Sequence, residues 1–213
     1  MGFDDGPFSH AHRGRVLLVG ALCAGTRLDG VVSGHVRRDG GDAASRMIDL
    51  VRSSQFGDSI RAVMLQGIAV GGFNVVDVHE LSRALDVPVL IVTRRPPDLD
   101  AVRRALFSEA PPGRPRVAGA ERKWDLIVAA GPVEFLGPSR RALRRLAGAR
   151  AYPAGSKGEQ PVPRIYVQRI GLTVEAARKL IEATTLHGNI PEPVRIAHLI
   201  AGGIVVGRSR GRA

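Results

Sequence analysis

The stretch G-F-D-D-G-P-F-S-H-A-H-R-G-R-V-L-L-V-G-A-L-C-A, from Gly2 to Ala24, decides how the fold begins. It opens on the stub of a strand that ends in two adjacent aspartates, and a continuous apolar run, Val16–Ala24, follows as a second strand. Asp29-Gly30 is typical of a turn, and weak alternation over Val31–Arg38 predicts a third, antiparallel strand. The sequence therefore predicts three consecutive strands at the start of the chain.

Helices and strands alternate after this opening. Apolar residues at helical spacing predict two helices that begin at Asp42 and Pro193, and four more over Val75–Leu85, Asp98–Ser108, Ser139–Leu146 and Thr173–Thr184. Short apolar runs predict strands at Ala62–Leu65, Val87–Val92, Leu126–Ala129 and Ile165–Ile170. The Pro-, Gly- and Arg-rich segment 109–123 is typical of a mobile loop.

This order favours an α/β fold in which a mixed sheet is flanked by helices. The ribonuclease H-like arrangement is the best-known fold of this kind, and it gathers acidic groups at one edge of the sheet. With 213 residues, the chain is expected to form a single domain over 1–213. No apolar run is long enough to span a membrane and no signal peptide is visible, so we expect a cytoplasmic protein.

The charge balance is strongly basic, with a net charge of +11 that comes almost entirely from arginine. Arginine binds phosphate through a fixed fork of donors, so this balance favours nucleic acid as the partner. A genome that favours arginine codons is the alternative explanation. The single cysteine, Cys23, excludes an intramolecular disulfide and is expected in the core.

Acidic residues stand at three turns of this basic chain, in G-F-D-D-G-P-F, D-G-G-D-A and G-G-F-N-V-V-D. The candidate catalytic residues are Asp4, Asp5, Asp42 and Asp77, of which Asp4, Asp42 and Asp77 are the candidate metal ligands. Carboxylates drawn together from distant segments suit a hard divalent cation, which cancels their repulsion and activates water at a phosphodiester. Successive strand residues face opposite ways, so one of Asp4 and Asp5 is expected to face the metal.

Each of these aspartates also has a structural alternative. Asp4 and Asp5 are compatible with a polar turn before Gly6-Pro7, Asp42 with a helix N-cap, and Asp77 with a favourable charge in a first helical turn. Asp39 is interpreted as a turn residue.

The three acidic motifs and the terminal P-E-P-V-R-I-A-H-L-I-A (Pro191–Ala201) resemble a family described as endonuclease dU, which acts on DNA that contains deoxyuridine. That family is similar in turn to endonuclease V, a ribonuclease H-fold nuclease that uses magnesium to nick nucleic acid beside a deaminated base. Pro88–Pro97 and Thr173–Ala177 carry this second likeness together with the terminal motif. The resemblance implies an endonuclease of DNA repair that requires Mg²⁺, with Mn²⁺ as the alternative ion, and DNA with deaminated bases as its partner.

This chain departs from endonuclease V at two positions. Asp4 matches the aspartate on that family's first strand, but Leu65-Gln66-Gly67 stands where the family has V-D-G, so an acidic ligand is replaced by Gln66. The histidine expected shortly before the late helix falls near Ile170 and is absent. Asp42 is the candidate for the family's glutamate, and Asp77 is the candidate that restores the lost charge.

Basic residues near the expected site are candidates for binding nucleic acid. Arg94 and Arg95 leave the end of a predicted strand, whereas Arg140, Arg141, Arg144 and Arg145 form a helical stripe that is otherwise a solvated face. His198 is either a half-buried structural residue or an aid to proton transfer. The alternative to a nuclease is a non-catalytic nucleic-acid-binding protein that has kept the scaffold and lost the site.

Overall fold

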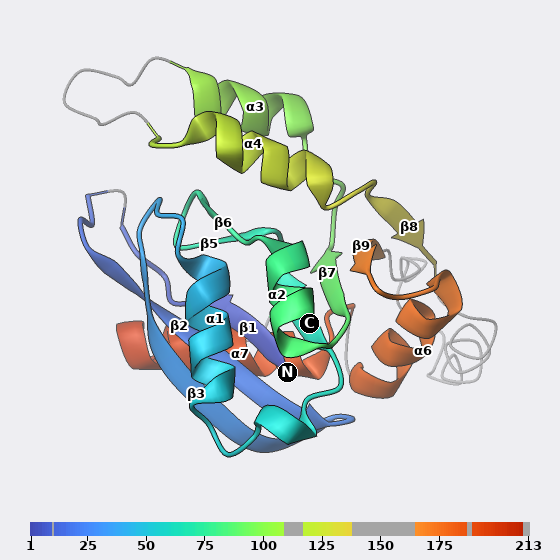
Figure 1. Ribbon diagram of the computed structural model, residues 1–213. Helices are drawn as coiled ribbons and strands as arrows, with labels where there is room; N and C mark the ends of the chain where they lie inside the picture. The colour runs from blue at the N-terminus through green and yellow to red at the C-terminus, as the bar shows by residue number, and fades with distance from the viewer. Residues whose placement is uncertain (10, 109–116, 138–164, 187–188, 211–213) are drawn as a thin grey trace, which may run out of the picture.

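A seven-stranded mixed sheet lies at the centre of the computed structural model, which describes residues 1–9, 11–108, 117–137, 165–186 and 189–210 (Figure 1). The strands stand in the order β3-β2-β1-β4-β7-β9-β8. Their bounds are β1 Gly2–Asp5, β2 Arg15–Ala24, β3 Arg27–Arg37, β4 Val63–Gln66, β7 Val89–Thr93, β8 Glu134–Leu136 and β9 Ile165–Ile170. The three central strands, β1, β4 and β7, are parallel, and every other neighbouring pair is antiparallel.

Helices cover both faces of this sheet. On one face lie α1 Ala43–Arg52 and α2 Val78–Leu85, and on the other lie α6 Val174–Thr184 and α7 Glu192–Val206. The remaining two described helices, α3 Leu99–Phe107 and α4 Ala120–Ala129, pack against each other and against the hairpin that follows β4. A short 3₁₀ turn, Gly57–Ser59, precedes β4, and a two-stranded hairpin, β5 Ala69–Val70 and β6 Asn74–Val75, follows it. None of the helices in the described ranges combines the length and apolar character needed to cross a membrane.

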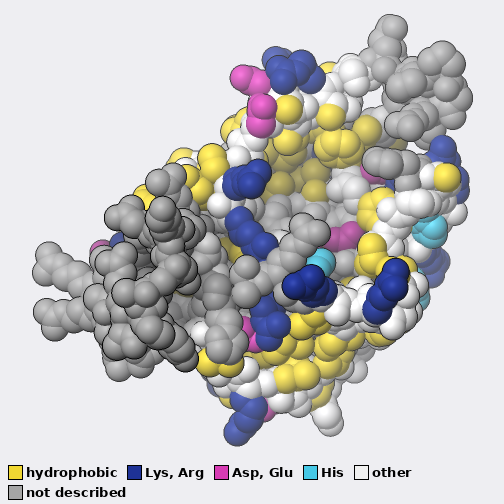
Figure 2. All heavy atoms as spheres, turned by 180° about the vertical axis from the view of Figure 1, so that it is seen from behind, with side chains coloured by type: hydrophobic (Ala, Val, Ile, Leu, Met, Phe, Trp, Pro, Cys, Tyr) yellow, Lys and Arg dark blue, Asp and Glu magenta, His cyan; other side chains and the backbone are white. Residues whose placement is uncertain are grey.

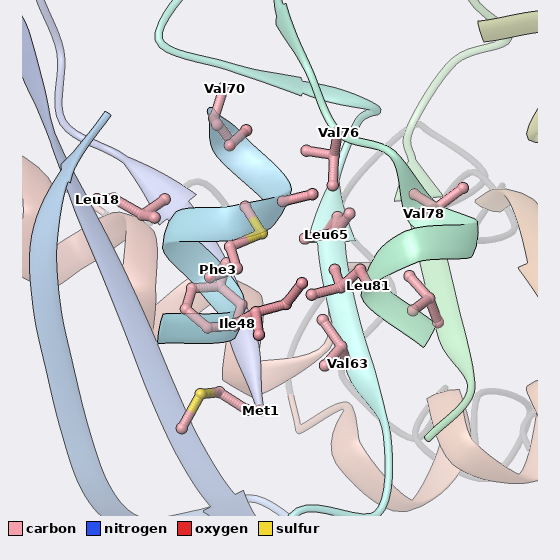
Figure 3. Packing of buried hydrophobic residues seen from close by; sticks show 14 of the residues in the cluster. Met1, Phe3, Leu18, Ile48, Val63, Leu65, Val70, Val76, Val78 and Leu81 are labelled. Atoms are coloured by element: carbon pink, nitrogen blue, oxygen red, sulfur yellow. The ribbon is translucent and has the colours of Figure 1, made fainter. Parts of the chain in front are cut away.

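Alternation along the parallel strands sends side chains to the two faces in turn. One face of the strands packs against α1 and α2, in the cluster drawn in Figure 3, and it carries Phe3 of β1 together with Val63 and Leu65 of β4. The intervening Met64 packs on the other face with α6 and the start of α7. Both faces of the central strands are therefore buried, as expected for parallel strands covered by helices.

Helix α7 lies behind the sheet in Figure 1 and runs in the same direction as β1. A methyl group at Gly2 would lie 2.3 Å from the backbone of Pro193, and one at Gly6 would lie 2.7 Å from the side chain of Val205. These glycines allow the helix to approach the strand closely along its whole length. The start of α7 therefore meets the start of β1, and its end lies beyond Asp5.

The structure confirms the mixed sheet flanked by helices and the first three strands, but it moves several boundaries. The turn between β2 and β3 falls at 25–26, where Gly25 has φ +64°, and Asp29 and Gly30 lie within β3. Glycine adopts a positive φ without strain, so the chain turns at Gly25 and not at the Asp29-Gly30 pair. The strand expected at Leu126–Ala129 is instead the end of α4, because its apolar side chains pack on one helix face against the β5–β6 hairpin.

Two further expectations concern loops and helix starts. Helix α4 begins at Ala120, inside the segment 109–123 expected to be a loop, and residues 109–116 lie outside the described ranges. The helix expected from Val75 begins only at Val78, because Asn74 and Val75 form β6. The predicted strand Ile165–Ile170 and the helix capped by Thr173 are both confirmed. The helix expected at Ser139–Leu146 lies outside the described residues.

Candidate active site

Asp4 and His198 form a pair across the interface between β1 and α7. His198 Nδ1 lies 2.7 Å from Asp4 Oδ2, where it donates a hydrogen bond to the carboxylate. The side chain of Asp4 is 10% exposed, whereas that of His198 is 48% exposed. A carboxylate that orients one ring nitrogen of histidine leaves the other, Nε2, available to hold or release a proton at the surface.

Burial controls the charge of Asp4. Burial first and the nearby carboxylate of Asp5 second raise the pKa of Asp4, and the hydrogen bond from His198 opposes both, so that the pKa moves from 3.8 to about 6. Desolvation and a like charge favour the neutral form of an acid. Titratable groups shifted by such specific neighbours concentrate at functional sites.

Asp5 faces the opposite side of the strand, as its position next to Asp4 predicts. Its Oδ2 accepts a hydrogen bond of 3.0 Å from the backbone N–H of Gly71, in the β5–β6 hairpin. Burial raises the pKa of Asp5, and the bond from Gly71 opposes that shift. Gly71 has φ +57° and Gly72 has φ +85°, which a side chain would strain, so the glycine pair lets this turn reach the strand end.

The same edge of the sheet carries the ends of β4 and β7. Phe3 pairs with Leu65 in parallel register, so the next residues along, Asp4 and Gln66, lie beside one another. Gln66 is exposed. Because β7 is parallel to β4, the exposed Arg94 and Arg95 leave the sheet at this edge as well, as expected. Acidic, amide and guanidinium groups thus gather at the carboxyl ends of the three parallel strands.

Asp42 is held in a hydrogen-bonded cluster of its own. It precedes α1 but makes no side-chain capping bond to that helix. Asn74 of β6 takes that role, because its Oδ1 accepts from the N–H of Ala43 at 3.0 Å. The amide of Asn74 then donates to Asp42 Oδ1 at 2.7 Å, and the N–H of Arg37 donates to the same oxygen at 3.1 Å.

Asp77 is the N-cap of α2. Its side chain accepts a hydrogen bond of 2.8 Å from the backbone N–H of Glu80. Within the described ranges, no group of three or more His, Cys, Asp or Glu side chains lies close enough to hold a metal ion. The structure therefore pairs Asp4 with His198 and leaves Asp42 and Asp77 in separate local contacts, so the three expected ligands do not converge.

A network that the sequence did not indicate supports the hairpin beside Asp5. Lys123 of α4 is 5% exposed, and its Nζ donates a hydrogen bond of 2.6 Å to the carbonyl of Asp39. Asp39 in turn donates its N–H to the carbonyl of Gly71 at 2.8 Å and accepts from the N–H of Phe73 at 2.8 Å. Asp39 has φ +51°, which agrees with its interpretation as a turn residue. Lys123 stands at the end of the segment 109–123 that was expected to be a loop, so no sequence signal marked it as a buried residue of a helix.

The face behind the sheet presents this site to solvent. Figure 2 shows histidine and acidic side chains side by side near the middle of that face, with Lys and Arg side chains gathered around them. Arg140, Arg141, Arg144 and Arg145, the other candidates for phosphate contact, lie outside the described residues.

The family model described as endonuclease dU matches residues 1–205 of this chain. The chain belongs to the endonuclease dU family. Among its relatives, a UPF0215 protein of Deinococcus radiodurans is 42% identical over 212 residues, which cover 100% of this chain and 91% of that protein. A UPF0215 protein of Methanosarcina barkeri is 36% identical over 214 residues and is covered to 93%.

Solved structures place this endonuclease dU family member in a wider fold group. A protein of unknown function from Archaeoglobus fulgidus superposes with a TM-score of 0.73 at 30% identity, over 96% of both chains. Endonuclease V of Bacillus subtilis superposes with a TM-score of 0.50 at 11% identity, over 92% of this chain and 76% of that one. The endonuclease V-like fold expected from the sequence is confirmed, and the family and the fold both resemble those of nucleases.

Proposed function

We propose that this protein is a metal-dependent endonuclease that nicks DNA at or near deaminated bases, as a step of DNA repair. The observation that carries the proposal is the Asp4–His198 pair at the end of β1, in a chain whose family model is that of endonuclease dU. Deoxyuridine as the preferred base rests on the family description alone. A basic protein attracts the phosphate backbone of nucleic acid, so the net charge of +11 supports the same proposal.

The donors at this edge fit a hard divalent cation. Mg²⁺ binds proteins through one or two carboxylates and completes its shell with water and substrate phosphate, so a three-carboxylate cage is not required. Asp4 is the first candidate ligand, with Gln66 beside it on β4, whereas Asp5 lies at the next position of β1 and faces the opposite side of the strand. The raised pKa values of Asp4 and Asp5 mark a place where a cation relieves electrostatic strain. Mg²⁺, or Mn²⁺ in its place, would supply Lewis acidity and an activated water.

His198 has a direct role in this proposal. Asp4 holds the ring by Nδ1, so Nε2 faces the substrate side and can pass a proton to the leaving oxygen of the broken phosphodiester. Arg94 and Arg95 hold the backbone of the nucleic acid at the same edge. Asp42 and Asp77 stay candidates that complete the site only through a movement of α1 or α2 toward β1.

The test is a nicking assay on three labelled duplexes that contain uracil, inosine or no damaged base, each with Mg²⁺ and with a chelator. We expect nicks beside the deaminated base that depend on the metal. The undamaged duplex should stay intact. Equal nicking in the chelator, or none on any duplex in Mg²⁺ or Mn²⁺, would contradict the proposal.

A second candidate function is a non-catalytic nucleic-acid-binding protein. The observation that favours it is Gln66 at the position beside Asp4, together with the absence of a three-acid cluster from the described residues. Such a protein would bind the duplexes in chelator and in Mg²⁺ alike and would never nick them. The same assay therefore separates the two functions.

A further inference from the structure

The chain reverses direction at the end of α7. Gly207 has φ +75°, and its N–H donates to the carbonyl of Gly203 at 2.9 Å, which is a left-handed helix end. The segment that follows turns back onto the helix. A methyl group at Gly202 would lie 2.7 Å from Ser209 Oγ and 3.1 Å from Ser209 Cβ, so Ser209 rests on the bare backbone of Gly202.

This reversal places the segment beside the candidate active site. Gly202 follows His198 by one helical turn, so the two residues lie on the same side of α7. Val205 packs against Gly6, one residue past Asp5, so the end of α7 lies at the same edge of the sheet as Asp4. Residues 207–210, named here the arginine arm, therefore run back along α7 toward the Asp4–His198 pair.

The arginine arm carries two charges that the rest of the described structure does not neutralise. Arg208 and Arg210 are exposed on either side of Ser209, and within the described ranges neither makes a hydrogen bond or ion pair. The one acidic side chain of α7, Glu192, is buried at the other end of the helix and paired with Arg195. Two cations that flank a hydroxyl form a donor set suited to phosphate oxygens.

We propose that the arginine arm binds the sugar-phosphate backbone of the nucleic acid on the α7 side of the Asp4–His198 pair. The inference rests on the proposed function, because it takes nucleic acid as the substrate. Arg94 and Arg95 leave the sheet at the end of β7, whereas the arm lies over α7. The two sets of arginines thus flank the acidic edge and hold the backbone on both sides of the scissile phosphate.

The first test measures binding without cleavage. The affinity for a fluorescent uracil-containing duplex is measured by anisotropy in chelator over a range of salt concentrations. Each lost phosphate contact lowers the salt slope by about 0.9, so Arg208→Gln/Arg210→Gln should lower it by about 2 and weaken binding about tenfold or more at 0.1 M salt. The control Arg46→Gln/Arg83→Gln removes the same charge from exposed positions on α1 and α2, across the sheet, and should leave the slope within about 0.5 of the wild type.

A second pair of variants keeps both arginines and moves only the arm. Gly202→Leu pushes Ser209 away, whereas Gly203→Leu points into open space, since nothing lies within 4 Å of a methyl group there. Gly202→Leu should therefore weaken duplex binding about threefold or more, and Gly203→Leu should bind as the wild type does.

The outcomes separate the two proposals. If the wild-type protein does not bind the duplex, the proposed function fails and this inference fails with it. If the wild-type protein binds but the arm variants keep its salt slope, or match the α1–α2 control, only the arginine arm is wrong.

Discussion

At the scale of the residue, Asp4 combines burial, a like-charged neighbour and a histidine partner. The first two raise its pKa, so the folded protein holds a proton on Asp4 at a pH where the unfolded chain has released it. Stability from this residue is therefore present at low pH and is lost as the pH rises from about 4 to about 6. At neutral pH the buried negative charge of Asp4 is unfavourable, and a bound cation would offset it.

Replacement of this carboxylate should stabilise the metal-free fold. Asp4→Asn keeps an oxygen that accepts from His198 and removes the buried charge. In chelator at pH 7 it should therefore raise the free energy of unfolding by about 3 kcal/mol, since the pKa of Asp4 is raised from 3.8 to about 6 and each pKa unit corresponds to about 1.4 kcal/mol. The gain should shrink toward zero near pH 4. Urea denaturation at both pH values measures it, with the exposed Asp58→Asn as a control that changes little. An Asp4→Asn variant less stable than the wild type at pH 7 would contradict the conclusion that the buried charge of Asp4 destabilises the metal-free fold.

His198 should act on the chemical step and leave binding unchanged. His198→Ala removes the group that passes a proton, so single-turnover nicking in Mg²⁺ should fall about 10²–10⁴-fold. The affinity for the duplex in chelator should change less than about twofold, because the proposed contacts to the phosphate backbone come from the arginines and not from His198. Equal losses in binding and in nicking would assign His198 a structural role instead.

At the scale of the element, much of the fold could be predicted because it depends on local pattern. The strand Ile165–Ile170 and the helix that Thr173 caps follow from an apolar run and an N-cap, and both were confirmed. The end of α4 was misread as a strand, since Leu126–Ala129 is a short apolar run whose period is ambiguous. The hydrogen bond of Asn74 to Ala43 joins residues 31 apart, and no local pattern predicts such a contact.

The candidate site was predictable only in part. Asp4 and His198 were both candidates, but their pairing joins residues 194 apart and depends on the close approach of α7 to Gly2 and Gly6. For Asp42 and Asp77 the sequence looks the same whether the aspartate binds a metal or only stabilises the start of a helix. The structure shows the second role for Asp77 and a bond to Asn74 for Asp42.

The N-cap of α2 gives a test of that distinction. Asp77→Ala removes the acceptor for the N–H of Glu80 and should lower the free energy of unfolding by about 1 kcal/mol. Asp77→Ser, which restores an N-cap without a carboxylate, should recover most of the stability. If Asp77 is only a cap, both variants nick the uracil duplex at the wild-type rate. A loss of nicking in the stable Asp77→Ser variant would show that its carboxylate serves the site.

Helix α4 should control the mobility of the hairpin beside Asp5. Lys123→Met removes the donor to Asp39 while it keeps most of the buried volume, so the turn that holds Gly71 loses its support. Amide hydrogen exchange at Gly71 and Phe73 should become about tenfold faster, whereas exchange at β4 and β7 should be unchanged. The exposed Lys179→Met is the matched control. Unchanged exchange at Gly71 would contradict the role of Lys123.

At the scale of the whole molecule, the sheet order brings three strand ends, one helix and one hairpin to a single edge. Asp4 and Asp5 stand there in a chain whose net charge is +11, so a small acidic site lies within a basic surface (Figure 2). A basic surface attracts the backbone of nucleic acid, and the acidic centre is where a cation would bind and cleavage would occur. The fold thus keeps the arginines that would hold the backbone apart from the carboxylates that would hold the cation.

The most direct test of this account is the single-turnover nicking rate of Asp4→Asn on a uracil-containing duplex in Mg²⁺, measured at protein concentrations that saturate binding. Loss of the buried carboxylate should lower the rate about 10³-fold or more while the protein stays folded and still binds the duplex. A folded Asp4→Asn variant that nicks within about tenfold of the wild-type rate would contradict the assignment of the active site to this edge of the sheet.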